Sequence, residues 1–356
     1  MYPVAPVTRT GADDNRRFFI SMTRSGLRMS PGSRRNIWLR AYHSPMSFRA
    51  LRFLALPFVW VGAATLAATS APTSILFIGN SFTFGQGSAV HFWRSNTVTD
   101  LNKEGIGGVP ALFKAMTTEA GLDFDVSLET HPGVGLDWHL ANKRDVIASR
   151  PFDLVVMHGY STLDSAKPGD PATLIATTKE MAGVLAGKNP KVEIYTTATW
   201  SRADQTYPQG RPWFGKPIDT MAIDVRAGYD KAATTSPAIK AVIPVGEAWN
   251  RAFKTGLADT NPYDGIDAGK MNLWADDNYH ASTHGYYLEA LMVFGDVTRR
   301  DPRELGANEC AAYKLGMSGT QAKALQQIAF DQLIAEKGMT LTPPSSTGLK
   351  LSGRCK

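Results

Sequence analysis

The sequence predicts an α/β fold with three layers, α/β/α, in which a parallel sheet of five strands lies between helices. Two observations predict it. Five short apolar runs read as buried strands, and segments with helical apolar spacing separate them. Short, continuously apolar strands that alternate with helices are typical of a parallel sheet covered on both faces. In such sheets ligands bind at the carboxyl ends of the strands, so functional residues are expected there.

The elements follow in chain order. The predicted strands are the apolar runs at residues 74–79, 124–128, 153–157, 192–197 and 239–245. The predicted helices have apolar residues at helical spacing and cover residues 109–120, 136–148, 171–186, 219–233, 285–298 and 321–336.

The net charge of +6 lies in the N-terminal part of the chain. Residues 1–71 hold ten arginines and two aspartates, whereas residues 72–356 hold 28 basic and 30 acidic residues. The folded part is therefore slightly acidic, and its charge does not support a surface that binds polyanions. No nucleic-acid partner is expected.

A secretory signal peptide is predicted at residues 46–71. Arg49 and Arg52 precede an apolar run from residue 53 to about residue 66, and small residues follow up to Ala71. The apolar run is too short to span a bilayer comfortably, which favours cleavage over the alternative, a retained membrane anchor. We therefore expect export to the periplasm or the cell exterior, without a stable membrane span after cleavage.

The remaining segments divide the chain further. Residues 1–45 carry eight arginines and neither helical nor strand periodicity, so either translation starts at Met46 or the charged region of the leader is unusually long. Neither alternative contributes to the fold. The predicted domain covers residues 72–338, and a Pro/Ser/Gly-rich tail, expected to be loosely held, follows at residues 339–356.

The sequence contains two cysteines, Cys310 and Cys355. In an exported protein an even number permits one disulfide, although two free thiols remain the alternative. There is no CxxC motif and no Cys/His cluster at zinc-ligand spacing, so neither a metal nor another cofactor is expected. The oligomeric state does not follow from the sequence.

Ser81 is the candidate nucleophile. It lies in the segment Gly79-Asn80-Ser81-Phe82-Thr83, directly after the first predicted strand. A serine at a tight turn after a buried strand faces the active-site edge, and its own N–H group can face a developing oxyanion. Gly79 permits a sharp turn without a side-chain clash. The alternative is a serine or threonine that only caps a helix.

Asp277 and His280 are the candidate partners of that serine. A serine hydroxyl requires a base, and the base requires a partner that fixes its tautomer. An aspartate three residues before a histidine, in one loop anchored by the predicted helix 285–298, provides both. Asp276 and His284 are rivals, but the spacing favours Asp277 and His280.

Together these motifs resemble the SGNH/GDSL hydrolase superfamily, in the branch with GNS in the nucleophile block. The motifs are GNSFT after the first strand and DNYHASTHGYYLEA near the C-terminus. The resemblance implies a flavodoxin-like sheet, Ser81 as nucleophile, and a triad completed by Asp277 and His280. It also implies that a glycine N–H after the second strand contributes to the oxyanion hole together with the N–H of Ser81. Gly133 fits that position best, with Gly135 as the rival.

The third block departs from the family pattern. The family ends this strand with GxND, whose asparagine donates to the oxyanion, but here the strand is followed by His158-Gly159-Tyr160-Ser161. Tyr160 occupies the asparagine position, and its hydroxyl could replace the missing donor in the oxyanion hole. Loss of one such donor costs about 10²–10³ in rate, so an active enzyme needs a substitute.

Aromatic residues in the long loop 200–217 suggest a substrate-binding wall. Trp200 and Trp213 are predicted to contact substrate, together with His158, although aromatic loop residues more often pack the loop itself. His131 and His139, which flank the second block, are predicted to lie on the surface.

The sequence thus predicts an exported serine esterase that hydrolyses small acyl esters through an acyl-enzyme, and O-acetyl groups on carbohydrate are the expected substrate. The triad does not distinguish hydrolysis from transfer to a sugar hydroxyl, so an O-acyltransferase is one alternative. The departure in the third block leaves a second alternative, a non-catalytic glycan-binding relative.

Overall fold

The computed structural model describes residues 71–343. The predicted segment 1–45, nearly all of the predicted signal peptide and the end of the predicted tail lie outside these residues. The described chain contains a six-stranded sheet. Its strands are β1 (Thr73–Gly79), β2 (Thr99–Asp100), β3 (Phe124–Thr130), β4 (Leu154–Met157), β5 (Glu193–Ala198) and β6 (Ile239–Pro244).

The order of the strands is β2-β3-β1-β4-β5-β6, and all neighbouring pairs are parallel. The five predicted strands are confirmed, and β1 lies between β3 and β4 as in a flavodoxin-like sheet. The sixth strand, β2, was not predicted because it has only two residues, both polar, at the edge of the sheet. In register, Thr73 of β1 lies opposite Phe124 of β3.

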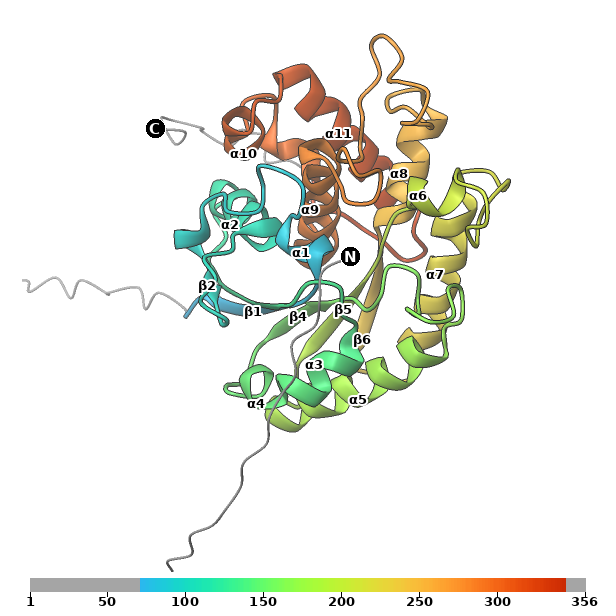
Figure 1. Ribbon diagram of the computed structural model, residues 1–356. Coiled ribbons are helices and arrows are strands. Elements are labelled where there is room, and N and C mark those ends of the chain that lie inside the picture. The colour runs from blue at the N-terminus through green and yellow to red at the C-terminus, as the bar shows by residue number, and fades with distance from the viewer. Residues whose placement is uncertain (1–70, 344–356) are drawn as a thin grey trace, which may run out of the picture. The chain divides into compact units, whose positions relative to one another are not determined.

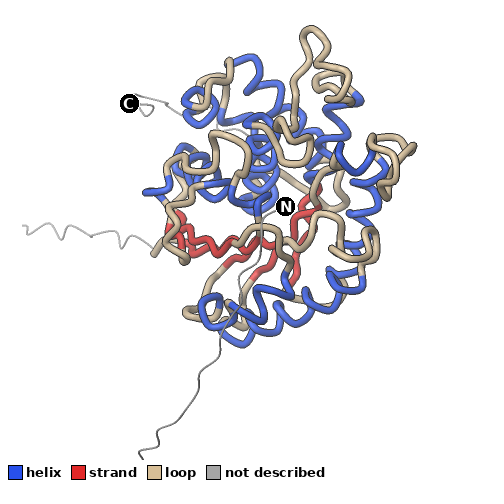
Figure 2. The backbone as a smooth tube through the Cα atoms, in the orientation of Figure 1, coloured by secondary structure: helices blue, strands red, loops and turns tan. Residues whose placement is uncertain are grey.

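Helices cover both faces of the sheet, which lies between them in Figure 2. One face carries α3 (Leu136–Asn142), α4 (Arg144–Ile147) and α5 (Ala172–Lys188), and the other carries α1 (Ser81–Phe84), α2 (Gly108–Glu119) and α9 (Thr283–Thr298) (Figure 1). The other helices of the described chain are α6 (Ala203–Thr206), α7 (Thr220–Ala233), α8 (Val245–Lys254), α10 (Cys310–Lys314) and α11 (Gly319–Leu333). The three-layer prediction is confirmed.

Strand β1 shows why the apolar runs are continuous. Ile75 and Phe77 belong to the core under α2 and α9, whereas Leu76 and Ile78 belong to the core under α3 and α5. Successive side chains point to opposite faces of a strand, so a strand that is covered on both faces needs apolar residues at every position. The sheet therefore has a separate hydrophobic core on each side.

Some helices differ from the prediction. The helix expected at residues 136–148 is interrupted at Lys143, which separates α3 from α4. Helix α8 was missed because it begins at Val245, directly after β6, within the apolar run that was assigned to the strand.

The C-terminal segment is partly tied to the domain. Thr342 donates its N–H to the carbonyl of Arg299 at 2.7 Å and forms a bridge with Arg300, so the tail is held at least to residue 343. Cys310 is disulfide-bonded, and Cys355 lies outside the described residues. Among the helices of residues 71–343, none has the length and hydrophobicity that a membrane-spanning helix requires.

Candidate active site

Ser81 lies at the first position of a single helical turn that follows β1. The strand ends at Gly79, Asn80 caps the turn with its side chain, and Gly85 ends it in the left-handed conformation at φ 80°. The side chain of Ser81 is almost buried, with 5% of the residue exposed. The predicted serine therefore lies at the carboxyl end of a central strand, where ligands bind in parallel sheets.

Asn80 connects three loops around this serine. Its Oδ1 accepts the N–H of Phe82 at 3.1 Å. Its Nδ2 donates to the carbonyls of Val134 at 2.8 Å and Gly159 at 3.1 Å, which follow β3 and β4 respectively. One amide side chain thus fixes the nucleophile block against the second and third blocks.

The predicted acid and base form a preassembled pair. Asp277 Oδ2 lies 2.6 Å from His280 Nδ1, and Oδ1 accepts the backbone N–H groups of Tyr279 and His280. Burial raises the pKa of Asp277, but these three hydrogen bonds outweigh it and leave the pKa below its usual value. Asp277 therefore remains a carboxylate that can orient the imidazole.

The two rivals lie elsewhere. Asp276 is exposed and makes no hydrogen bond with another described residue. His284 lies at the start of α9, where its side chain interacts with Gln321 of α11. The structure thus favours the pairing of Asp277 with His280 that the spacing predicts.

The nucleophile loop and the histidine loop meet. The rings of Phe82 and His280 have centroids 5.7 Å apart. The hydroxyl of Tyr286, on α9, is 3.1 Å from the carbonyl of Ser81 and 3.0 Å from that of Gln86. His280 Nε2 is buried and has no hydrogen-bond partner among the described residues, so a bond to Ser81 Oγ is not formed in this conformation.

Two backbone N–H groups are available for an oxyanion. Within residues 71–343, neither the N–H of Ser81 nor that of Gly133 donates to another residue. Gly133 adopts φ 70°. Gly135, its rival, packs against the ring of Tyr160. The Tyr160 hydroxyl donates to Asp137 Oδ2 at 3.3 Å, so in this conformation its proton is directed at a carboxylate rather than at the predicted oxyanion.

A small polar cavity lies between these loops. It has a volume of about 180 Å³ and is lined by Asn80, Gly133, Tyr160, Ser161, Thr162, Ser165, Arg202 and Tyr279. Neither Ser81 nor His280 lines it, but Asn80 and Tyr279 are their immediate neighbours in the chain. The predicted catalytic and oxyanion segments therefore converge on one cavity.

The three predicted substrate contacts are buried instead, which corrects the sequence prediction. Trp200 is fully buried and stacks between Phe82 and Trp249, at ring-centroid distances of 4.2 Å and 4.7 Å. Trp213 packs in the core beside α7, and its Nε1 donates to Asp224. His158 is also buried and lies behind the nucleophile turn. None of the three lines the cavity between the loops.

His139 also differs from its prediction. It was expected on the surface of a helix, but its side chain is completely buried, 2.5 Å from the equally buried carboxylate of Glu129. The signal that could have found this pair is Glu129 itself, an acidic residue at the end of a strand whose neighbours are buried.

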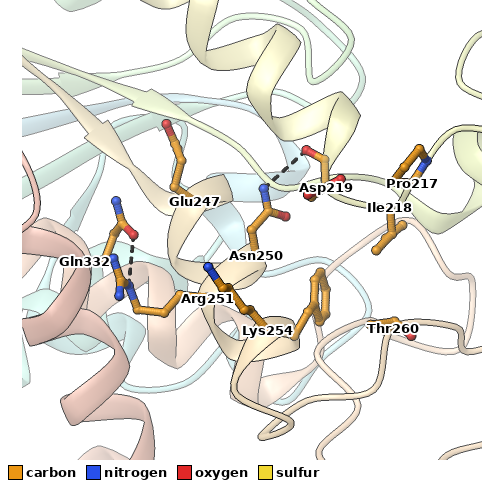
Figure 3. Close-up of a pocket in the computed structure, with 10 residues that line it drawn as sticks. Pro217, Ile218, Asp219, Glu247, Asn250, Arg251, Lys254, Thr260 and Gln332 are labelled. Carbon is orange, nitrogen blue, oxygen red and sulfur yellow. Dashed lines mark hydrogen bonds between the residues drawn. The ribbon is translucent and has the colours of Figure 1, made fainter.

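A larger depression lies away from this cavity, with a volume of about 470 Å³. Figure 3 shows that Asn250, Arg251 and Lys254 of α8 contribute to it, together with Asp219 before α7 and Gln332 of α11. No predicted catalytic residue lines it. Among the described residues, no cluster of three or more His, Cys, Asp or Glu side chains could hold a metal ion.

Comparison with known proteins supports the fold. A DUF4886 family protein from Bacteroides uniformis aligns with a TM-score of 0.51 and 17% identity over 76% of this chain and 98% of its own. The chain shares this fold. A protein from Slackia heliotrinireducens assigned as an SGNH hydrolase aligns with a TM-score of 0.43 and 20% identity, over 64% of this chain and all of its own. A Clostridium thermocellum family 3 carbohydrate esterase aligns with a TM-score of 0.42 and 14% identity, over 64% of this chain and 98% of its own.

The neighbours thus include one protein named as an SGNH hydrolase and one named as a carbohydrate esterase. At these identities the likeness concerns the fold and leaves the activity open. No family model and no curated protein matches the chain.

Proposed function

We propose that this protein is a serine esterase in which Ser81 is the nucleophile, His280 the general base and Asp277 its orienting partner. The observation that carries the proposal is the Asp277–His280 pair, whose free Nε2 is buried beside the helical turn that bears Ser81. A buried ring nitrogen without a partner is unfavourable, and a hydrogen bond from the Ser81 hydroxyl would supply one. Catalytic hydrogen bonds are often longer without substrate and shorten when it binds.

The mechanism is acyl transfer through a covalent intermediate. His280 Nε2 takes the hydroxyl proton of Ser81 while Oγ bonds to the ester carbonyl carbon, and Asp277 stabilises the imidazolium. The free N–H groups of Ser81 and Gly133 donate to the oxyanion. The tetrahedral intermediate then breaks its bond to the alcohol oxygen, which receives the proton from His280. Water attacks the acyl-enzyme by the same route and releases the acid and Ser81.

The cavity supports a small acyl group on a polar substrate. Its volume of about 180 Å³ lies below the ~300–1,000 Å³ of pockets for drug-sized ligands, so it suits an acetyl group better than a long acyl chain. The side chains of Ser161, Thr162 and Ser165 supply hydroxyl groups that can bond sugar hydroxyls. We therefore propose an O-acetylated carbohydrate as the substrate class, consistent with the carbohydrate esterase among the structural neighbours.

Arg202 provides a fixed polar group in this cavity. Its guanidinium is bidentate to Asp204, at 2.9 Å and 2.6 Å, and donates to Ser161 Oγ at 3.2 Å. It also lies 3.5 Å from the ring centroid of Tyr279, the residue before His280. Two of its five N–H groups remain for substrate oxygens, and the ion pair with Asp204 leaves the cavity without a strong preference for anions.

We also propose that the enzyme acts outside the cytoplasm, which follows from the predicted signal peptide at residues 46–71. Expression of the full chain and mass spectrometry of the exported product test this point. We expect a mature N-terminus at Pro72, and retention of the intact leader on a cytoplasmic protein would contradict it.

Hydrolysis of p-nitrophenyl acetate and of acetylated oligosaccharides tests the proposed activity. The wild-type protein should release acetate, Ser81→Ala should lose activity about 10⁴-fold or more, and Ser149→Ala should retain it. Ser149 is a suitable control because it is exposed after α4, before the start of β4. Equal rates for the wild type and Ser81→Ala would overturn the proposal. Acetyl transfer to an added sugar that exceeds hydrolysis would instead assign the same triad to an acyltransferase.

A further inference from the structure

A buried Glu–His pair lies behind the nucleophile turn and has no part in the mechanism above. Glu129 is the penultimate residue of β3 and His139 lies on α3, and both side chains are completely shielded from solvent. His139 Nδ1 is 2.5 Å from Glu129 Oε2. The other ring nitrogen, Nε2, donates to the carbonyl oxygen of Gly79 at 3.0 Å. Glu129 Oε1 in turn accepts Asn102 Nδ2 at 3.2 Å.

His158 holds the other end of the same peptide group. The N–H of Asn80 donates to His158 Nε2 at 3.3 Å, and Thr83 Oγ1 lies 2.8 Å from that nitrogen. A ring nitrogen that accepts a backbone N–H carries no proton, so His158 is neutral with its proton on Nδ1. Burial is the main cause that lowers the pKa of His158 to about 3, and it keeps the ring in this form.

The two histidines therefore hydrogen-bond both polar groups of the peptide between Gly79 and Asn80. His139 binds its C=O and His158 binds its N–H. This peptide connects the last residue of β1 with the cap of α1, directly before Ser81. A Cβ atom at Gly79 would overlap with Thr83 Oγ1 and with the His158 ring, so the turn packs directly against the histidine.

Stability alone is a weak reason for such an arrangement. Replacing a buried ion pair with apolar residues of similar size is often neutral or stabilising, because burial of the charges offsets their attraction. The geometry points to a different use of the pair, since His139 Nε2 binds the carbonyl of the one peptide that precedes Ser81, and His158 binds the N–H of the same peptide. A misplacement of about 1 Å at a reacting group can cost about 10²-fold in rate.

We propose that Glu129, His139 and His158 are positioning residues that fix the orientation of the Gly79–Asn80 peptide, and through it the N–H and Oγ of Ser81. The inference rests on the proposed role of Ser81 as nucleophile. Glu129 fixes the ring of His139, as carboxylates fix the histidines of catalytic and metal sites. None of the three touches the substrate.

Three variants separate positioning from packing. His139→Leu removes the donor to Gly79 O at similar size, His139→Gln restores an amide Nε2 that can reach it, and Glu129→Gln removes the charge that holds the ring. With p-nitrophenyl acetate we expect kcat to fall about 10- to 100-fold in His139→Leu, with KM within about twofold of wild type. His139→Gln should recover most of the loss, and Glu129→Gln should be intermediate.

Leu185→Ala is the matched control for destabilisation. Leu185 lies on α5 in the same core as Leu136 and Leu140 of α3, so its truncation loosens the packing around His139 without touching the Gly79–Asn80 peptide. We expect a lower Tm with an unchanged kcat. If His139→Leu does not fold, the ratio of kcat in Glu129→Gln to that in wild type, with the rate of Ser81 labelling by a fluorophosphonate, gives the same comparison.

The outcomes distinguish this inference from the proposed function. If wild-type activity depends on Ser81 but the His139 and Glu129 variants keep full kcat and labelling rate, the positioning role is wrong. The proposed esterase function is then supported independently of it. A kcat loss in Leu185→Ala equal to that in His139→Leu would also overturn positioning, since it would assign both losses to packing. If the wild type itself shows no Ser81-dependent activity, both the proposed esterase function and the positioning role are wrong.

Discussion

The carboxylate of Asp277 and the imidazole of His280 are joined by a hydrogen bond of 2.6 Å between Oδ2 and Nδ1. The second carboxylate oxygen accepts two backbone N–H groups from the same loop, which prevents rotation of the carboxylate. Because Nδ1 donates to Asp277, the proton of the neutral ring lies on Nδ1, and Nε2 is left to accept a proton. The loop thus presents the tautomer that a general base for Ser81 requires.

Replacement of Asp277 tests this arrangement. In Asp277→Asn the amide can donate to Nδ1, which favours the tautomer with its proton on the wrong nitrogen. We expect kcat/KM for p-nitrophenyl acetate to fall by about 10²–10⁴-fold. Asp276→Asn is the matched control, because Asp276 is exposed one residue earlier and should retain activity. Equal losses in both variants would show that the chosen carboxylate has no special role.

Asn278 determines the shape of this loop. It adopts φ 57°, a conformation that asparagine tolerates and β-branched residues disfavour. We expect Asn278→Val to lower the free energy of unfolding by about 1–2 kcal/mol and to lower kcat, because the Asp277–His280 pair shifts. Asn278→Gly should keep both within a small margin of wild type. Urea unfolding and steady-state kinetics provide the two measurements, and full activity in Asn278→Val would argue against a rigid pair.

Substitution by alanine should lower the stability of the protein at Gly79 and raise it at Gly183. A Cβ at Gly79 would overlap with Thr83 and His158, so Gly79→Ala should lose most activity and lower Tm. Gly183 lies inside α5 with open space around its Cα, so Gly183→Ala should raise the free energy of unfolding by roughly 0.5–1 kcal/mol. A Gly79→Ala protein with wild-type kcat would contradict the tight packing of the nucleophile turn.

The buried His158 predicts a pH dependence of stability. Burial, aided by the charge of His139, lowers its pKa to about 3, whereas an unfolded histidine titrates near ~6.5. Below pH ~6.5 the unfolded chain binds a proton that the folded protein excludes, so the unfolding free energy falls as the pH falls toward 3. We expect His158→Gln to reduce this fall by about 2 kcal/mol between pH 7 and pH 5 in urea titrations. An unchanged pH slope would show that His158 is protonated in the fold.

The sheet could be predicted because its strands are buried on both faces. Residues 74–79 and 153–157 read as strands from composition alone, since no polar face interrupts them. Strand β2 gave no such signal because its two polar residues pair with β3 only at the edge. Helix α8 was hidden because its first residue continues the apolar run of β6.

The site was predictable where spacing within one loop determines geometry, and less so where the fold brings distant residues together. Asp277 and His280 pair three residues apart, as their spacing indicates. Trp200 was assigned to the substrate because a loop sequence does not tell which side of the loop faces the interior. The Glu129–His139 pair joins β3 to α3, and although a buried acidic residue in β3 signals that a partner is needed, the sequence does not identify His139 as that partner.

Covalent trapping of the nucleophile is the most direct measurement of the central claim. The protein is incubated with a small fluorophosphonate, digested, and analysed by tandem mass spectrometry. The account predicts one adduct, on Ser81, which forms at least 10²-fold more slowly in His280→Ala and at the wild-type rate in His284→Ala. An adduct on another serine, or no adduct on a folded protein that still hydrolyses p-nitrophenyl acetate, would contradict it.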